Sequence, residues 1–285
     1  MPETRITPVL VGSGQTIDRP DDPTAGREPL ALMEETARRA AADAGGGAAL
    51  LAAVDTVAVA NVICHDYGDA PGLLAERLGC HPRRTIYTTL GGNTPQSLVT
   101  LLCDEIVAGR SAVALIAGAE AWHTMRARSK AGLPSNWTPA RETAAPRWGD
   151  PRPGVSELEA RHGAARPIEA YPMYENAFRA ARGLSLDAHR RELGEFAARC
   201  AAIAAHNPYA WFRDGKDAAT LSTVTAENRM IGFPYPKFMN AILDVNQGAA
   251  LLLTSDAAAR HLGIAVDRWV YPWSGVDVVE HWFMQ

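Results

Sequence analysis

A glycine-rich turn, Gly91-Gly92-Asn93, carries the strongest indication of chemistry in this 285-residue sequence. It follows an apolar run at residues 85–90 and precedes Pro95, which suits the first position of a helix because its missing N–H is not needed there. Backbone amides at such a helix start favour a developing negative charge, such as that on a thioester oxygen. The alternative is structural, because two glycines also let a chain bend between a buried strand and a buried helix. The local sequence leaves both interpretations open.

Histidines and cysteines give weaker signals. The eight histidines contain no i, i+4 pair and no HExxH motif, so we expect no metal site. His206, just before Asn-Pro-Tyr, is the strongest candidate among them for a catalytic role, although lone histidines are more often surface or packing residues. The four cysteines form no CxxC pair, which argues against a zinc site and a disulfide framework.

Other short motifs lack the context that their chemistry needs. Gly12-Ser-Gly14 has Ile17 where a dinucleotide fingerprint would have its third glycine. The GxSxG motif of serine hydrolases is absent. We therefore interpret the first two glycines as a tight exit from a strand.

The strands and helices around the Gly91-Gly92-Asn93 turn must hold it in place. The sequence predicts them from short apolar runs that alternate with helical patterns. Residues 7–14 predict a buried strand that ends at glycines, and residues 29–41 have apolar side chains at helical spacing. The elements expected next are a strand at 54–60, a helix at 72–78, a strand at 85–90, a helix at 95–108 capped by Thr94 and a strand at 112–119. The last strand is wholly apolar, which is typical of parallel strands covered by helices on both faces.

A change of composition marks an insertion at residues 123–240. Prolines, aromatic residues and charges replace the earlier pattern, and only one helix is clearly predicted, from Ser185 to about His206. The earlier pattern then returns with a strand at 246–255, a helix at 257–262 and a strand at 269–271. We expect one α/β core domain, formed by residues 1–122 and 241–273, that is interrupted by an inserted domain.

Composition excludes several classes of protein. A hydrophobic content of 47% can fill a large core, and a net charge of −4 without basic clusters argues against nucleic acid as a partner. No apolar run reaches the roughly 20 residues of a membrane helix, and residues 1–5 do not begin a signal peptide. We expect a cytoplasmic protein.

Taken together, these segments resemble the thiolase superfamily, in particular the branch of sterol-carrier-protein thiolases and thiolase-like proteins. The resemblance implies a thiolase-like fold, a layered α/β core domain interrupted by a loop domain. Four stretches carry it in the family's order: residues 11–16, the strand–turn–helix–strand at 85–120, the His206-Asn-Pro-Tyr segment and the Asp244–Ser255 return strand. Tyr174-Glu-Asn-Ala-Phe178 is similar to the family's NEAF motif, but it lies in the insertion and we treat it as chance.

One departure from the family concerns the nucleophile. In thiolases the turn before the buried helix begins with a cysteine that takes the acyl group from a thioester. Counting back from Gly109 places that position at Gly92, or at Gly91 with one gap, and neither can attack a substrate. Cys103 lies too far into the helix, roughly 15 Å from its start. The resemblance thus implies Gly91, Gly92 and Asn93 as an oxyanion position without a nucleophile.

A second departure concerns length. The family's carboxyl-terminal half supplies a NEAF-like element, a Gly-His-Pro histidine and a second cysteine, and this sequence has none of them in family context. We expect residues 274–285 to begin a connection to a further domain of a longer chain, or else a partner subunit to complete the site.

Three functions remain open under the resemblance. They are a retro-aldol lyase acting on a CoA thioester with an OB-fold partner, a non-catalytic CoA- or lipid-binding module, and a thiolytic acyltransferase. Coenzyme A would be a substrate or ligand rather than a bound cofactor, and Arg229 and Lys237 of the insertion are weak candidates for its contacts. Members of this family pair through the sheets of their core domains, so the resemblance implies a homodimer.

Overall fold

The computed structural model describes residues 6–278, and they separate into two compact units. Residues 6–151 and 244–278 form the first unit, and residues 152–243 form the second. These boundaries differ from those expected from composition, because residues 123–151 lie with the core. The expected connection at 274–285 is described only as far as Val278, and its remainder lies outside the described residues.

Side-chain bonds explain why the segment after residue 130 belongs to the first unit. The backbone N–H of Thr138 donates to Glu28 Oε2 at 2.8 Å, and the Arg141 guanidinium donates to Asp69 at 3.1 Å. Both acceptors precede helices of the core, so the segment is held against it.

The first unit is built on a six-stranded mixed sheet with the order β1-β8-β4-β2-β3-β5. Its strands are β1 Pro8–Ile17, β2 Thr56–Val59, β3 Arg84–Thr88, β4 Val113–Ala121, β5 Arg147–Trp148 and β8 Asn246–Ser255. Strands β2, β3 and β4 are parallel to one another, whereas β8 runs antiparallel between β1 and β4. The expected α/β fold is confirmed, although the sheet is mixed.

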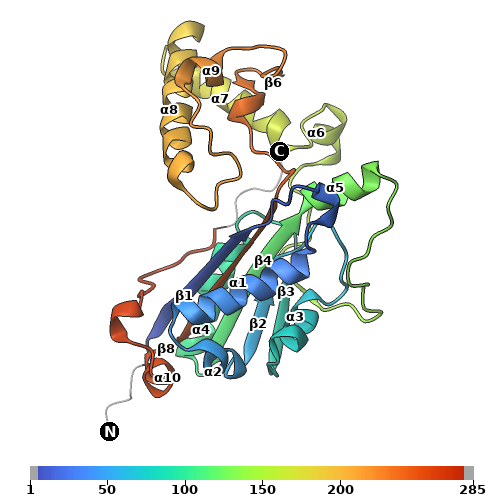
Figure 1. Ribbon diagram of the computed structural model, residues 1–285. Coiled ribbons are helices and arrows are strands. Elements are labelled where there is room, and N and C mark those ends of the chain that lie inside the picture. Colours follow the sequence, from blue (N-terminus) through green and yellow to red (C-terminus); the bar gives the residue numbers. More distant parts are fainter. Residues whose placement is uncertain (1–5, 279–285) are drawn as a thin grey trace. The chain divides into compact units, whose positions relative to one another are not determined.

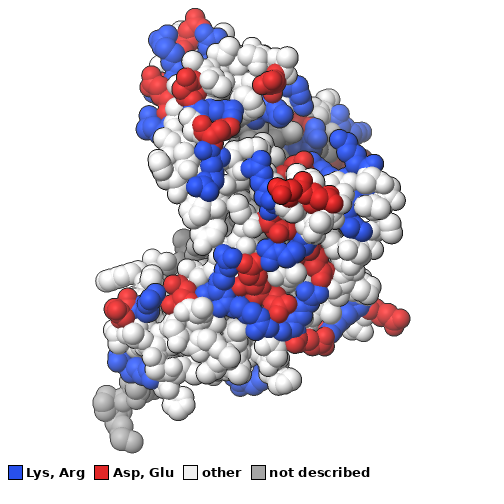
Figure 2. All heavy atoms as spheres, viewed as in Figure 1, with Lys and Arg blue, Asp and Glu red and all other residues white. Residues whose placement is uncertain are grey.

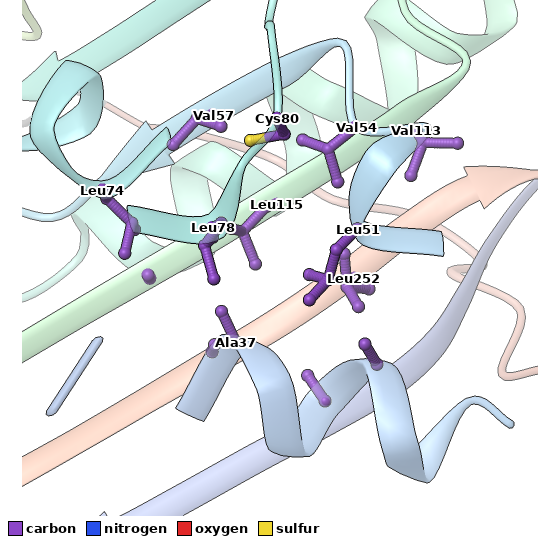
Figure 3. Close-up of a cluster of buried hydrophobic side chains, with 14 of the residues drawn as sticks. Ala37, Leu51, Val54, Val57, Leu74, Leu78, Cys80, Val113, Leu115 and Leu252 are labelled. Atoms are coloured by element: carbon purple, nitrogen blue, oxygen red, sulfur yellow. The ribbon is translucent and has the colours of Figure 1, made fainter. Parts of the chain in front are cut away.

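Helices cover both faces of this sheet (Figure 1). The unit contains α1 Pro29–Asp43, α2 Gly47–Ala52, α3 Ala70–Leu78, α4 Thr94–Val107, α5 Trp122–Lys130 and α10 Asp256–His261, with short 3₁₀ turns η1 Pro23–Ala25 and η3 Val266–Arg268. Helices α1, α2 and α3 share one face, where Ala37, Leu51 and Leu78 surround Leu115 and Leu252 (Figure 3). Helix α4 buries its apolar side on the opposite face. Burial of each large aliphatic side chain contributes about 1.5–3 kcal/mol.

Three expectations about the core need correction. The first strand does not stop at Gly14 but continues to Ile17, and its glycines sit where α1 packs closest: a Cβ on Gly12 would lie 2.1 Å from the Ala40 carbonyl oxygen. The expected strand at 269–271 is a single bridge between Leu10 and Val270, after the turn η3. Thr94 is not a cap but the first residue of α4, and the N-cap is Asn93.

The second unit is mainly helical. It contains α6 Glu157–Arg161, α7 Pro167–Ala181, α8 Leu186–His206 and α9 Ala218–Ser222, a hairpin of β6 Met230–Gly232 and β7 Tyr235–Pro236, and the turn η2 Lys237–Met239. The predicted helix after Ser185 is confirmed as α8, and the Ser185 hydroxyl caps it by accepting from the Ala188 N–H at 3.2 Å. Helices α6 and α7 were not expected, because proline and charge obscure their periodicity.

Charges are interspersed on the surface. Figure 2 shows positive and negative side chains next to one another on the face it views. Arg38–Glu34 and Arg39–Glu35 on α1 are ion pairs of this kind, each one helical turn apart. No helix within residues 6–278 combines the length and the apolar character needed to cross a bilayer.

Candidate active site at the start of helix α4

The candidate site lies where the carboxyl ends of the parallel strands meet the start of α4. Strand β3 ends at Thr88, and the chain reaches α4 through the turn that contains Gly91, Gly92 and Asn93. Gly92 and Asn93 are exposed to solvent, whereas Thr94 is buried. In open α/β sheets this edge is where ligands generally bind.

Hydrogen bonds of the backbone define the start of the helix. The Gly91 carbonyl accepts from the Thr94 hydroxyl at 2.8 Å and from the Thr94 N–H at 3.2 Å. Asn93 is the N-cap, but its side chain makes no capping bond, and Pro95 follows in the first turn. The first amides of α4 are thus not satisfied by an N-cap side chain. This is the positive end of a 14-residue helix.

Steric space distinguishes the two glycines of the turn. A Cβ built on Gly92 meets no described atom within 4 Å, and the Gly92 φ angle is one that other residues also adopt. A Cβ on Gly91 would lie 2.9 Å from Asn93 Oδ1 and 3.1 Å from Thr94 Cγ2. Gly92 is therefore the position at which a side chain fits, and it leaves open space at the helix start.

An arginine from β5 brings a positive charge to the end of β3. Arg147 donates to the Thr88 carbonyl at 3.1 Å and to the Asn61 side chain, and its guanidinium lies 3.7 Å from the centre of the Tyr87 ring. The Thr88 hydroxyl accepts from the Asn61 N–H at 3.0 Å. Arg147 thus ties the segment after β2 to the end of β3, three residues before Gly91.

Neither the Cys64 thiol nor the Glu120 carboxylate is free for catalysis, and the Asp277 carboxylate accepts a hydrogen bond from the Ser97 hydroxyl on α4. Glu120, near the end of β4, accepts from the N–H groups of Ile63 at 2.6 Å and Cys64 at 3.0 Å. Cys64 Sγ accepts from the Ala121 N–H at 3.3 Å. Burial, together with the Glu120 carboxylate, raises the pKa of the Cys64 thiol, and burial also raises the pKa of Cys103. Both thiols remain protonated and weakly nucleophilic.

Comparison with known proteins identifies the fold. No family model matches the sequence, and no curated protein does. A crystal structure of a monomeric SCP2-thiolase-like protein, type 1, from Mycobacterium smegmatis is 33% identical, with a TM-score of 0.74 over 95% of this chain and 50% of that one. This chain has a thiolase-like fold. It spans about half the length of that relative.

Two more distant structures share the thiolase-like fold. The Ltp2-ChsH2(DUF35) aldolase matches 89% of this chain and 57% of its own at 19% identity, with a TM-score of 0.62. An acetyl-CoA acetyltransferase from Syntrophomonas wolfei matches 91% of this chain and 67% of its own at 14% identity, with a TM-score of 0.51. At these identities the likeness concerns the fold alone.

The remaining candidate residues of this thiolase-like chain belong to the second unit. His206 is exposed at the end of α8. Arg229 and Lys237 are exposed beside the two ends of the β6–β7 hairpin, where the Lys237 N–H donates to the Arg229 carbonyl at 2.9 Å. The structure therefore pairs these two residues through their backbones, whereas Gly91, Gly92 and Asn93 form a separate group in the first unit.

Sequence reasoning missed Arg147 and the role of Glu120. Arg147 lies in a segment without regular pattern, and only the pairing of β5 with β3 brings it to the site. Glu120 had a detectable signal, since it is a charged residue at the carboxyl end of an otherwise apolar strand. Among the described residues, no cluster of three or more His, Cys, Asp or Glu side chains could hold a metal ion.

Proposed function

We propose that this thiolase-like chain binds CoA thioesters at the start of α4 and takes part in carbon–carbon bond cleavage without a cysteine nucleophile. The observation that carries the proposal is the open space at Gly92 beside the uncapped start of a 14-residue helix. Such a site can polarise a thioester oxygen, but it has no thiol with which to attack the carbonyl carbon.

A retro-aldol reaction suits this chemistry. A base removes the proton of a β-hydroxyl group, the bond between Cα and Cβ breaks, and Cβ leaves as a ketone or aldehyde. The electron pair passes to the thioester as an enolate, whose oxygen lies at the helix start, and Cα is then protonated. The helix amides stabilise negative charge that develops in the transition state, which is where such stabilisation accelerates a reaction.

We propose that the base comes from elsewhere in the assembly, because the Asp277 carboxylate beside α4 is bonded to the Ser97 hydroxyl. Glu120 and Cys64 are occupied by backbone hydrogen bonds, so neither is available for this role. We propose His206 or a residue of a partner, and the partner that we favour is an OB-fold protein. A related assembly supports this view, since one structure with the same fold is named as an aldolase of two components, Ltp2 and ChsH2(DUF35).

A non-catalytic acyl-CoA-binding module is the second candidate. It is favoured because the side chains of Glu120, Cys64 and Asp277 are each engaged in hydrogen bonds. Thiolytic acyl transfer, the activity in the name of the Syntrophomonas wolfei structure, is disfavoured because Gly92 has no side chain. Under either of the first two functions, the ligands would be CoA thioesters of lipid or sterol metabolism.

Binding and cleavage assays test the proposal in sequence. Calorimetry with acetyl-CoA should detect binding to the purified chain, and no heat of binding would contradict both candidates. A β-hydroxyacyl-CoA should then be cleaved in the presence of a co-encoded OB-fold protein. Binding without cleavage, with or without that protein, would favour the binding module. Cleavage of acetoacetyl-CoA by free CoA would overturn the argument from Gly92.

The expected homodimer is a separate proposal. Strand β5 pairs with β3 at Tyr87 and Thr88, so two copies could join through this stretch of β3 only if β5 left it. The relative from Mycobacterium smegmatis is described as monomeric. Sedimentation velocity over a range of concentrations decides the matter, because a constant monomer mass would contradict the dimer.

A further inference from the structure

Arg147 is a cation beside the candidate site that no acidic side chain neutralises. No carboxylate within residues 6–278 forms an ion pair with it, and the residue is exposed to solvent. The Asp66 carboxylate, whose charge also acts on the Tyr87 hydroxyl, accepts a hydrogen bond from the Gly68 N–H at 2.9 Å. The positive charge of Arg147 is therefore available to a ligand.

Three contacts hold the Arg147 guanidinium in one orientation. Its Nη1 atom donates to the Asn61 side-chain oxygen and to the Thr88 carbonyl, the latter at 3.1 Å. The group lies 3.7 Å from the centre of the Tyr87 ring, which is itself fully buried. Because Nη1 makes both hydrogen bonds, the edge formed by Nε and Nη2 can serve a ligand. This edge of a guanidinium matches the two oxygens of a carboxylate or a phosphate.

A short series of contacts links Arg147 to the start of α4. The Thr88 carbonyl accepts from Arg147, and the Thr88 hydroxyl lies 3.5 Å from the Thr94 hydroxyl. Thr94 is the first residue of α4, where the proposed function places the thioester oxygen. Since only Thr88 lies between the two groups in this series, an anionic group a few bonds along the acyl chain can reach Arg147. The phosphates of CoA are separated from the thioester by the whole pantetheine chain, so they suit this position less well.

We propose that Arg147 binds a carboxylate on the acyl chain of the CoA thioester, so that the site prefers thioesters of dicarboxylic acids. The carboxylate accepts hydrogen bonds from Nε and Nη2 while the thioester oxygen lies at the start of α4. This inference rests on the proposed thioester site and adds the charge of the acyl group that it takes. A guanidinium that is already held in place loses little conformational entropy on binding, which favours such a contact.

Two thioesters of the same shape test the proposal. Glutaryl-CoA ends in a carboxylate, whereas 5-methylhexanoyl-CoA has two methyl groups in place of the two carboxylate oxygens. Calorimetry on the purified full chain at low salt should show glutaryl-CoA binding about five- to tenfold more tightly. Arg147→Gln should remove this preference and leave the affinity for 5-methylhexanoyl-CoA unchanged.

Control variants separate the role of Arg147 from folding and from net charge. Arg147→Lys keeps the charge but not the planar group, so it should retain only part of the preference. Arg83→Gln removes an exposed cation just before β3, at the opposite end of that strand, and should retain the whole preference. The affinity for 5-methylhexanoyl-CoA reports in each variant whether the thioester site is intact.

The outcomes have distinct meanings. Equal affinity of the wild type for the two thioesters, or a preference that survives in Arg147→Gln, would overturn the inference and leave the thioester site standing. If Arg147→Gln weakened both thioesters and free CoA alike, Arg147 would bind a phosphate of CoA, which also overturns the inference. Failure of both thioesters to bind the wild type would contradict the proposed function itself.

Discussion

Asn246 and Thr124, 122 residues apart in the sequence, are joined by two hydrogen bonds in the interior of the first unit. The Thr124 N–H donates to Asn246 Oδ1 at 3.1 Å, and Asn246 Nδ2 donates to Thr124 Oγ1 at 2.8 Å. Both residues are fully buried. Because Asn246 begins β8 and Thr124 lies in α5, these bonds attach the first residues of the expected insertion to the core sheet.

Removal of the Thr124 hydroxyl should destabilise this connection. Thr124→Val keeps the shape of the side chain but leaves Asn246 Nδ2 with one acceptor fewer, the Asp18 carbonyl at 2.9 Å being retained. We expect a loss of about 1–3 kcal/mol in the free energy of unfolding, measured by urea titration. Thr124→Ser, which keeps the hydroxyl, should lose much less. Equal losses would show that packing rather than the hydrogen bond matters.

A cysteine at Gly92 should be tolerated and activated. The Cβ of Gly92→Cys enters open space, and the thiol would lie at the positive end of α4, which lowers a thiol pKa below its ordinary value near 8.5. We expect faster alkylation by iodoacetamide at pH 7 than for Cys64 or Cys103, whose thiol pKa values are raised by burial. The rate as a function of pH measures this pKa.

Gly91→Cys is the matched control for that substitution. Its Cβ would approach Asn93 Oδ1 to 2.9 Å and Thr94 Cγ2 to 3.1 Å, so at least the Asn93 side chain must move. We expect a lower unfolding temperature for this variant than for Gly92→Cys. If both variants were equally stable and equally reactive, the distinction between the two glycines would be wrong.

Glu28 should make stability depend on pH in the acidic range. Burial opposes ionisation of this carboxyl group, but hydrogen bonds from Thr138 and the charge of Arg77 outweigh it and lower the pKa below the ordinary 4.5. A lowered pKa in the folded state stabilises the protein above the unfolded-state pKa, and this contribution is lost as the pH falls through the folded value. The wild type should exceed Glu28→Gln by about 2 kcal/mol near pH 7.

The pH series provides the decisive comparison for Glu28. Urea titrations between pH 7 and pH 3 should show the difference shrinking once the pH falls below about 4.5, where Glu28 of the unfolded chain begins to protonate, and continuing to shrink through the lower folded-state pKa. Glu34→Gln, which removes a surface ion pair with Arg38, should change stability by less than about 1 kcal/mol at every pH. A constant difference for Glu28→Gln would contradict the assignment.

The two cations beside the β6–β7 hairpin should contribute to CoA binding. Arg229 and Lys237 are exposed and adjacent through their backbone bond, so they can face one phosphate group together. We expect the double alanine variant to bind acetyl-CoA about tenfold more weakly in calorimetry at low salt, and the loss to diminish as salt screens the charges. Lys130→Ala, an exposed cation in the first unit, should bind like the wild type.

Periodicity was sufficient for most of the core and for helix α8 of the second unit. Helices α1, α3, α4 and α8 and strands β1, β2, β3, β4 and β8 were expected near their observed positions, because each has a clear apolar pattern and a glycine, proline or serine boundary. The end of β1 was misjudged, since Gly12 and Gly14 serve the close approach of α1, which no local pattern reveals. The strand expected at 269–271 was wrong because only Val270 has a partner to pair with.

The candidate site was predictable only in part. The turn at Gly91-Gly92-Asn93 could be found because glycines before a proline and an apolar helix are a local signal. Arg147 could not, since its position depends on a two-residue strand that exists only by pairing with β3. The contact between Thr138 and Glu28, which attaches residues after 130 to the core, spans 110 residues and has no local signal.

The position of β8 determines when this protein can complete its fold during synthesis. Strands β1 and β4 are made early, but each pairs along its length with β8, which starts only at Asn246. While the ribosome synthesises residues 122–245, both strands carry unpaired edges of the kind that associate with other chains. The helices α6 to α9 of the second unit all lie before β8 in the chain and can begin to form before the sheet is finished. Translation that pauses before β8 should therefore leave an aggregation-prone nascent chain that chaperones protect.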